Sequence, residues 1–138
     1  MNKKFLKLEL DFDFILLSIT SQLRDYRLCH YINKALDFNF EKVDDHEITF
    51  VGQSPKFYSK YLYYIEEVTP FYYLISNKGS DGYLIPELKG SDYFVIIKDF
   101  IDDEDLQYFI QTARNIPDIQ AIVELDPTKL KSKENLIF

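Results

Sequence analysis

The chain opens with a regular alternation of apolar and polar residues. Residues 6–14 place leucine or phenylalanine at every even position and Lys, Glu or Asp between them, which is typical of a strand with one face in water. The next segment, FILLSITSQL at 14–23, contains a short apolar run. Such a run fits a buried strand or one to two helical turns, and periodicity does not separate them. We predict a strand over 6–14 and then a short helix.

Two later segments have the spacing of amphipathic helices. In DYRLCHYINKALDF, beginning at Asp25, the apolar residues recur at helical intervals, and Asp25 is a candidate N-cap. From Asp102, the apolar residues of DLQYFIQTA again share one helical face. Asp102 and Asp105 have the spacing of a capping box. Pro117 ends this second helix, because proline lacks an N–H and clashes with the preceding turn.

Strand patterns occupy most of the remaining chain. The predicted strands are EITFV (47–51), KFYSKYLYYIEE (56–67), FYYLISN (71–77), DYFVIIKDF (92–100) and DIQAIVELD (118–126). Short connections between the first three favour antiparallel hairpins. The continuous apolar run of DYFVIIKDF favours a central strand. Residues 93–125 read strand, helix, strand, which predicts a crossover unit whose two strands are parallel.

These elements predict an α+β fold. We expect a mixed, mostly antiparallel sheet of about six strands, with two main helices packed on it and a strand-helix-strand unit in the C-terminal half. The length of 138 residues fits a single domain spanning residues 1–138. Residues 127–138 form an extended C-terminal tail in this prediction, and its apolar end is expected to dock on the domain.

Aromatic residues make up 17% of the chain, as twelve Phe and eleven Tyr with no Trp. Rings should therefore fill much of the core, and tyrosine hydroxyls must reach water or a partner. In the strand over 56–67, Tyr61 and Tyr63 point to one side and Tyr58 and Tyr64 to the other. Both faces of this hairpin are expected to carry aromatic surface.

The formal net charge of −7 makes the chain acidic. Phosphate backbones are repelled on average, so we predict no nucleic-acid partner. No apolar segment has the length of a membrane span, and the start of the chain does not fit a signal peptide. The single cysteine, Cys29, permits no internal disulfide. We predict a cytoplasmic protein with no membrane partner.

No motif of known catalytic or metal chemistry occurs. His30 and His46 lack ligand residues at zinc spacing. The acidic cluster over 99–105 lacks the spacing of a calcium loop, and carboxylates at a helix start are accounted for by the helix dipole and capping. Cys29 lies on the apolar helix face, which favours a buried thiol over a nucleophile. We predict no cofactor, no metal and no catalytic residue.

The arginine at position 27 lies where a helix disfavours positive charge. Arg27 falls in the first turn of the helix that begins at Asp25, an unfavourable end for positive charge. It should face solvent or pair with a carboxylate, and Glu87 and Asp92 are the candidates. Such a pair is either a salt bridge that fixes the helix to a loop or an anchor for an anionic ligand. Together with the neighbouring Tyr93, these four are the candidate binding residues.

The segment IPELKGSDY carries a family resemblance. Ile85-Pro86-Glu87 followed by Ser91-Asp92-Tyr93 resembles the signature of the IPExxxVDY family, an uncharacterised bacterial family, with Ser91 where the signature has Val. The similarity extends through DFILLSI, DYRLC, INKAL, YYLISNK and LKSKENLIF, and so covers most of the chain. The resemblance implies a bacterial protein and no assigned reaction.

These observations favour a non-catalytic protein-interaction module of a bacterial cytoplasm. The alternative is a binder of small anionic metabolites, or an unrecognised enzyme, with a pocket around Arg27, Glu87 and Asp92. Aromatic surface on both sides of the hairpin and open sheet edges also predict a homodimer. The identity of any protein partner does not follow from the residues.

Overall fold

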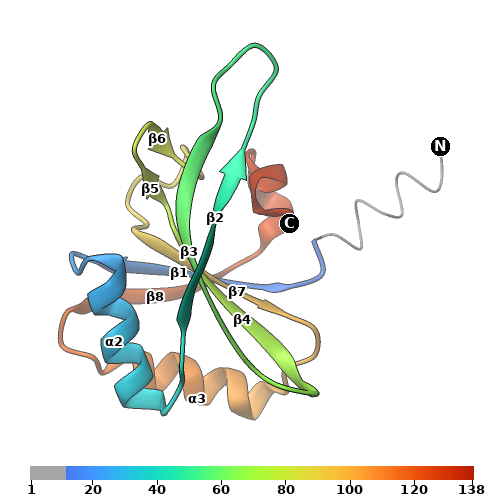
Figure 1. Cartoon of the computed structure of the whole chain (residues 1–138). Helices are drawn as coiled ribbons and strands as arrows, with labels where there is room; N and C mark the ends of the chain where they lie inside the picture. Colours follow the sequence, from blue (N-terminus) through green and yellow to red (C-terminus); the bar gives the residue numbers. More distant parts are fainter. Residues whose placement is uncertain (1–11) are drawn as a thin grey trace.

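A six-stranded sheet forms the centre of the molecule in the computed structural model, which describes residues 12–138 (Figure 1). The order across the sheet is β2-β3-β4-β7-β1-β8. In chain order the strands are β1 (Ile15–Ser21), β2 (Glu41–Ile48), β3 (Lys56–Ile65), β4 (Val68–Ser76), β7 (Tyr93–Lys98) and β8 (Ile119–Leu125). A separate two-stranded ribbon joins β5 (Lys78–Gly79) to β6 (Gly82–Tyr83).

Every neighbouring pair in the large sheet is antiparallel. Because β1 is antiparallel to both β7 and β8, those two strands run in the same direction with β1 between them. The predicted strand-helix-strand unit is therefore present in split form. β7 is central, as its continuous apolar run predicted.

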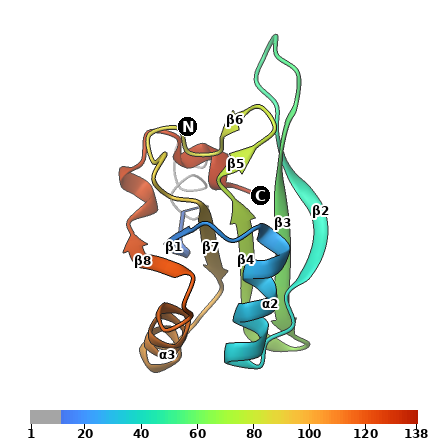
Figure 2. The same ribbon diagram turned by 90° about the vertical axis from the view of Figure 1, so that its left-hand side faces the viewer.

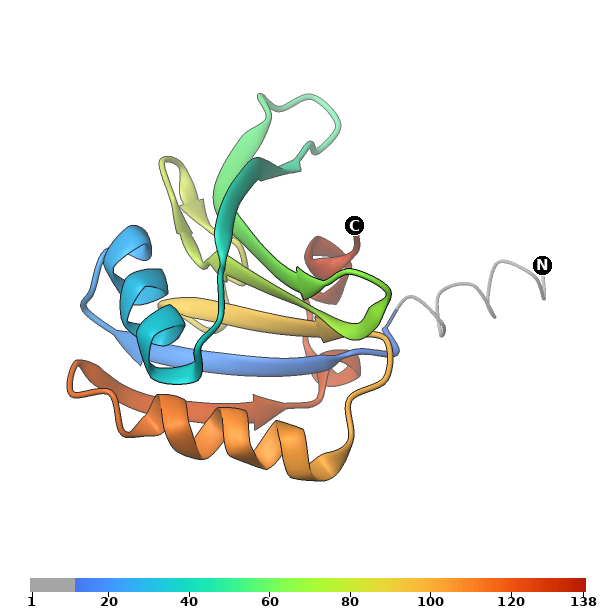
Figure 3. The same cartoon turned by 60° about the horizontal axis from the view of Figure 1, so that its bottom comes forward.

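Two helices, α2 (Asp25–Leu36) and α3 (Asp103–Arg114), cover the same face of the sheet (Figures 2 and 3). The predicted cap of α3 is confirmed, since the Asp102 side chain accepts a hydrogen bond from Asp105 N at 2.8 Å. The predicted cap of α2 is wrong. Arg24 is the N-cap, because Asp25 already belongs to the helix and its carboxylate accepts from the adjacent Tyr26 N.

Strand alternation divides the apolar residues between two cores. Along β7, Val95 and Ile97 pack beneath the helices, whereas Phe94 and Ile96 point to the opposite face. The rings of β3 divide in the same way, with Tyr61 on the helix side and Tyr58 on the other. The expectation of aromatic side chains on both faces of this hairpin is confirmed.

The second face is covered by irregular segments. The loop that follows β6 and the C-terminal residues close it, and Leu84, Ile85 and Leu136 are fully buried there. Residues 127–138 are not extended as predicted. They form two short 3₁₀ helices, η1 (Pro127–Lys129) and η2 (Lys133–Leu136), and their apolar end docks on the sheet as expected.

The predicted short helix in FILLSITSQL is wrong, because this segment forms β1. Its backbone pairs with β7 along one edge and with β8 along the other. Both of its faces are also covered, since Leu17 and Ile19 pack in the helix-side core and Leu16 packs in the opposite one, so the apolar residues need no alternation. The strand predicted over 6–14 lies outside the described residues except for its last three positions. Those three precede β1 and are not in a strand.

The strand predicted over 118–126 is present as β8, but its burial does not alternate along the strand. A register shift opposite Thr20 and Ser21 interrupts the ladder with β1, so Ile119 and Ile122 are buried while Val123 is 52% exposed. β2 begins earlier than predicted and ends at Ile48. Within residues 12–138, no helix is sufficiently long and apolar to cross a membrane.

Candidate functional site

Arg27 does not meet the carboxylates predicted as its partners. Its guanidinium lies on the exposed side of α2, where Nη2 donates to the Tyr31 hydroxyl at 3.2 Å and the carbon of the guanidinium lies 5.9 Å from the centre of that ring. The Tyr31 hydroxyl is the main cause of a raised pKa at Arg27. The pair at i and i+4 is a local helix contact.

Glu87 lies on the opposite side of the sheet and binds the C-terminal segment. Its two carboxylate oxygens accept hydrogen bonds from Ser132 N and Ser132 Oγ, each at 2.8 Å. Partial desolvation raises the pKa of Glu87, but the hydrogen bonds from Ser132 outweigh it and the net pKa is lowered. Glu87 therefore fixes the loop after β6 to the segment between η1 and η2.

Asp92 and Tyr93 bind the backbone near the end of β1. Asp92 Oδ2 accepts from Ser21 N at 2.8 Å, and the Tyr93 hydroxyl donates to Leu23 O at 2.5 Å. Burial raises the pKa of the Tyr93 hydroxyl. Both residues join the start of β7 to the turn that leads into α2.

The four predicted residues consequently do not form one site. Arg27 faces solvent on α2, Glu87 holds the C-terminal segment, and Asp92 with Tyr93 holds the end of β1. The predicted salt bridge between Arg27 and Glu87 or Asp92 is absent from the described residues. Glu87, Asp92 and Tyr93 lie close together in the sequence, and Arg27 was expected to reach them. The sheet instead separates Arg27 from Glu87.

Cys29 is 3% exposed, and burial raises the pKa of its thiol to about 12. This agrees with the predicted buried thiol. Across residues 12–138, no three acidic, histidine or cysteine side chains are grouped to hold a metal ion.

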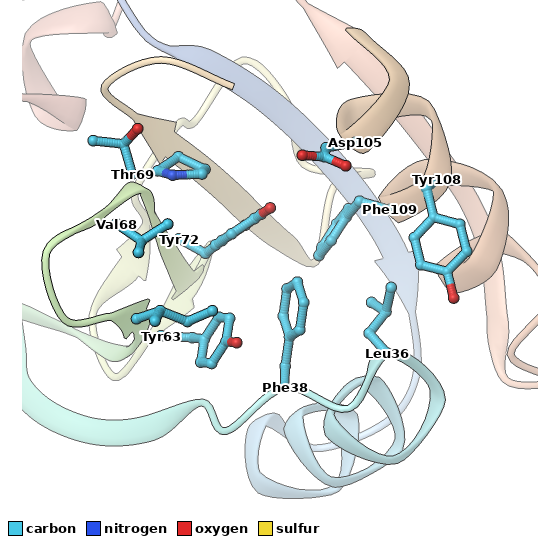
Figure 4. Close-up of a pocket in the computed structure, with 11 residues that line it drawn as sticks. Leu36, Phe38, Tyr63, Val68, Thr69, Tyr72, Asp105, Tyr108 and Phe109 are labelled. Atoms are coloured by element: carbon cyan, nitrogen blue, oxygen red, sulfur yellow. The ribbon is translucent and has the colours of Figure 1, made fainter. Parts of the chain in front are cut away.

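An aromatic pocket of about 250 Å³ lies where α2 ends, α3 begins and the β3–β4 hairpin turns (Figure 4). Five of its eleven lining residues are aromatic, and the one charged side chain in its lining is Asp105. The lining residues are Leu36, Phe38, Tyr63, Ile65, Val68, Thr69, Pro70, Tyr72, Asp105, Tyr108 and Phe109.

The turn after α2 places Phe38 in the middle of this pocket. Asp37 ends the helix in the left-handed conformation, with φ of 57°. The Asn33 side chain then accepts from Phe40 N at 2.8 Å and donates to Phe40 O at 3.3 Å. Together these contacts turn Phe38 inward between the hairpin and α3.

The rings form a continuous wall. Phe38 stacks on Tyr63 at 4.2 Å between ring centres and lies 4.9 Å from Tyr72. Tyr72 in turn stacks on Phe109 at 5.5 Å. Both Tyr72 and Phe109 are buried, so the floor of the pocket is rigid.

The rim of the pocket is apolar and exposed. Ile65 and Val68, on either side of the hairpin turn, are 55% and 50% exposed, and Tyr108 of α3 is 61% exposed. We call this rim and the pocket together the hairpin–helix face. Exposed apolar groups gathered around a concavity are typical of a binding surface.

The electrostatics of the hairpin–helix face are negative. Burial and then the nearby Asp105 carboxylate raise the pKa of Tyr72 to about 12, so its hydroxyl stays neutral. Glu66 and Glu67 form the hairpin turn between Ile65 and Val68. The pocket lining contains no Lys, Arg or His.

A second hollow, of about 290 Å³, is polar and borders Tyr93. Arg24 and Lys78 lie in its wall with Asp25, Ser59 and Ser76. Tyr93 is the one predicted site residue that lines it. Its two cations, Arg24 and Lys78, were not among the predicted site residues.

Comparisons of the chain with protein-family models, with curated proteins and with solved structures give no significant match.

Proposed function

We propose that the protein is a non-catalytic interaction module of a bacterial cytoplasm and that it binds a partner protein through the hairpin–helix face. The observation that carries this proposal is the aromatic pocket surrounded by exposed Ile65, Val68 and Tyr108. Binding energy in protein interfaces concentrates in aromatic and apolar anchors that fill pockets and lose their water. A rigid aromatic floor with an exposed apolar rim provides such a receptor for a partner's anchor residue.

The bacterial cytoplasm and membership of the IPExxxVDY family belong to the same proposal. They rest on the resemblance of IPELKGSDY and of the segments around it to that family. Glu87, Asp92 and Tyr93 of the signature each hold a distant backbone segment. In this interpretation the signature is structural and maintains the scaffold that presents the hairpin–helix face.

Site-specific photo-crosslinking in cells that produce the protein tests the binding face. A benzoylphenylalanine replaces Tyr108 in one variant and Tyr26, which is 60% exposed on α2, in the control. We expect a saturable crosslink from position 108, absent from position 26 and abolished by adding Ile65→Ser and Val68→Ser. Equal crosslinking from both positions, or none from position 108, would contradict the proposal.

A second copy of the chain is a competing occupant of this face. The homodimer predicted from the sequence is therefore an alternative to a different partner protein, and the sheet edges β2 and β8 offer a second surface for it. Crosslinks that contain two copies of the chain, together with light scattering that gives a dimer, would identify the partner as the protein itself. Light scattering that gives a monomer at high concentration would rule out the homodimer.

A second candidate function is binding of a small anionic metabolite. The observation that favours it is the polar hollow with Arg24 and Lys78, instead of a pocket around Arg27, Glu87 and Asp92. Two cations and two serine hydroxyls can bind a phosphate or carboxylate. A panel of anionic metabolites that raises the unfolding temperature, with the effect lost in Arg24→Gln, would support it, and a panel without effect would exclude it.

A further inference from the structure

The lining of the aromatic pocket restricts the chemistry of its occupant. A purely apolar group would remove water from the Asp105 carboxylate without giving it a partner, which is unfavourable. An anion would be repelled by Asp105. A cation on an apolar stem suits both features, because ring faces attract cations and the carboxylate pairs with them.

The size of the pocket restricts the occupant further. Pockets that enclose whole small-molecule ligands have volumes of about 300–1,000 Å³, and this one has about 250 Å³. It suits the end of one side chain. The remainder of the occupant must then lie on the exposed rim formed by Ile65, Val68 and Tyr108.

The surroundings of the pocket also favour a cation. Glu66 and Glu67 lie at the hairpin turn, and Asp103 and Glu104 lie in the first turn of α3 beside Asp105. The partial positive charge at the N-terminus of α3 is partly neutralised by its N-cap Asp102, whose carboxylate accepts a hydrogen bond from Asp105 N. The whole chain carries a formal charge of −7. A negative potential therefore surrounds the opening.

We propose that the pocket receives a lysine or arginine side chain of a partner protein, with the aliphatic stem against Phe38, Tyr72 and Phe109 and the charged end at Asp105. This inference rests on the proposed function and specifies the chemistry of its anchor. The partner segment that carries the cation also carries apolar residues, because they must cover Ile65 and Val68.

Titration by nuclear magnetic resonance with capped amino acids tests the anchor. The probes are N-acetyl methylamides of lysine and arginine, with norleucine as the apolar control of the lysine stem and glutamate as the anionic control. We expect one or both cations to shift the amide resonances of Phe38, Tyr72 and Asp105. Their dissociation constants should be about three- to tenfold lower than that of norleucine, and the difference should shrink as salt is added.

Two matched variants separate the pocket carboxylate from general acidity. Asp105→Asn and Asp103→Asn each remove one exposed carboxylate from the first turn of α3, but only Asp105 lines the pocket. We expect Asp105→Asn to weaken lysine or arginine binding about three- to tenfold and Asp103→Asn to change it less than twofold. Equal unfolding temperatures for the two variants exclude a difference in folding.

The outcomes distinguish this inference from the proposed function. Norleucine binding as tightly as lysine and arginine, or no probe shifting the pocket resonances, overturns the cationic anchor. Choline is titrated in the same way as a further probe. If it binds far more tightly than both amino acids, the cationic side-chain anchor is overturned in favour of a free quaternary ammonium ligand. If crosslinks from position 108 still appear in those cases, the interaction module stands and only its anchor is wrong.

Discussion

The two faces of the sheet are closed by different means. On one face, α2 and α3 pack apolar side chains onto the strands. On the other, the loop after β6 has no helix or strand, and the C-terminal segment has only two short 3₁₀ helices joined by irregular backbone. Helices satisfy their own backbone groups internally, whereas irregular segments need side chains to bind theirs. The second face is therefore held by specific polar contacts in addition to apolar packing.

Asn77 shows this difference most clearly. It is fully buried, and its side chain donates to Leu88 O at 2.9 Å and to Ser91 O at 2.7 Å, while its oxygen accepts from Ile85 N at 2.8 Å. On the helix side, α3 contacts the sheet through a hydrogen bond from Arg114 Nη2 to Ile122 O at 3.1 Å. One amide side chain thus organises the loop between β6 and β7.

The largest effect that we expect comes from Asn77→Ala. Three hydrogen bonds disappear and their buried partners remain unpaired, at about 1–3 kcal/mol for each unpaired group. We predict that the free energy of unfolding in urea falls by about 3 kcal/mol or more. The exposed Asn39→Ala is the control and should change it by less than about 0.5 kcal/mol. A similarly small change for Asn77→Ala would contradict the proposed role of its side chain.

A smaller and more local effect is expected from Leu136→Ala. Leu136 is as fully buried as Leu28 of α2, and burial alone predicts a loss of about 2–5 kcal/mol for either truncation. We predict that the C-terminal segment detaches locally in this variant, which places Leu136→Ala at the low end of that range. Hydrogen exchange should accelerate at residues 127–138 while α2 stays protected.

Leu28→Ala is the matched variant on the helix face. Its effect should reach the whole sheet, because α2 cannot leave without exposing the larger core. Uniform acceleration of exchange in Leu136→Ala, indistinguishable from Leu28→Ala, would show that the two faces unfold as one unit.

The smallest effect concerns pH and the second face. His46 is buried, and its Nε2–H donates to Asn135 O at 2.6 Å. Burial lowers the pKa of His46, the hydrogen bond to Asn135 opposes this, and Lys60 and Lys98 lower it again. A histidine whose pKa is lower when folded stays neutral in the native state while the unfolded state takes up a proton. Stability is therefore complete above the ordinary pKa of 6.5 and falls as the pH drops below it.

Urea unfolding at pH values on both sides of 6.5 measures this dependence. We predict that His46→Gln flattens the profile in that range and that His30→Gln, at an exposed position of α2, leaves it unchanged. A wild-type profile with no loss of stability below the ordinary pKa would refute the assignment to His46.

Sequence pattern was sufficient for the fold class and for both helices. α2 and α3 bury one face each, so their apolar spacing is visible in the sequence. It was insufficient for β1, because the two cores cover both of its faces and remove the alternation that identifies a strand. It also failed within β8, where a shifted register changes which residues are buried.

The candidate site could be predicted less well than the fold. The sequence selected Glu87, Asp92 and Tyr93 as residues that a turn does not require, and each does have a specific contact. Their partners Ser132, Ser21 and Leu23 lie 45 to 71 residues away, so spacing could not identify them. The aromatic pocket was missed because its rings come from three separated elements and were interpreted as core. Exposed Ile65 and Val68 around an acidic turn were the available signal.

The position of β1 between β7 and β8 has a consequence for synthesis of the protein. β1 leaves the ribosome well before β7 and β8, but Ile15 pairs with Ile97 and Leu16 pairs with Leu125. Both edges of an apolar strand therefore stay open until β7 and β8 have been made. Distant pairings of this kind slow folding and prolong exposure to aggregation. We expect nascent chains that end before β7 to depend on chaperones in a way that the completed protein does not.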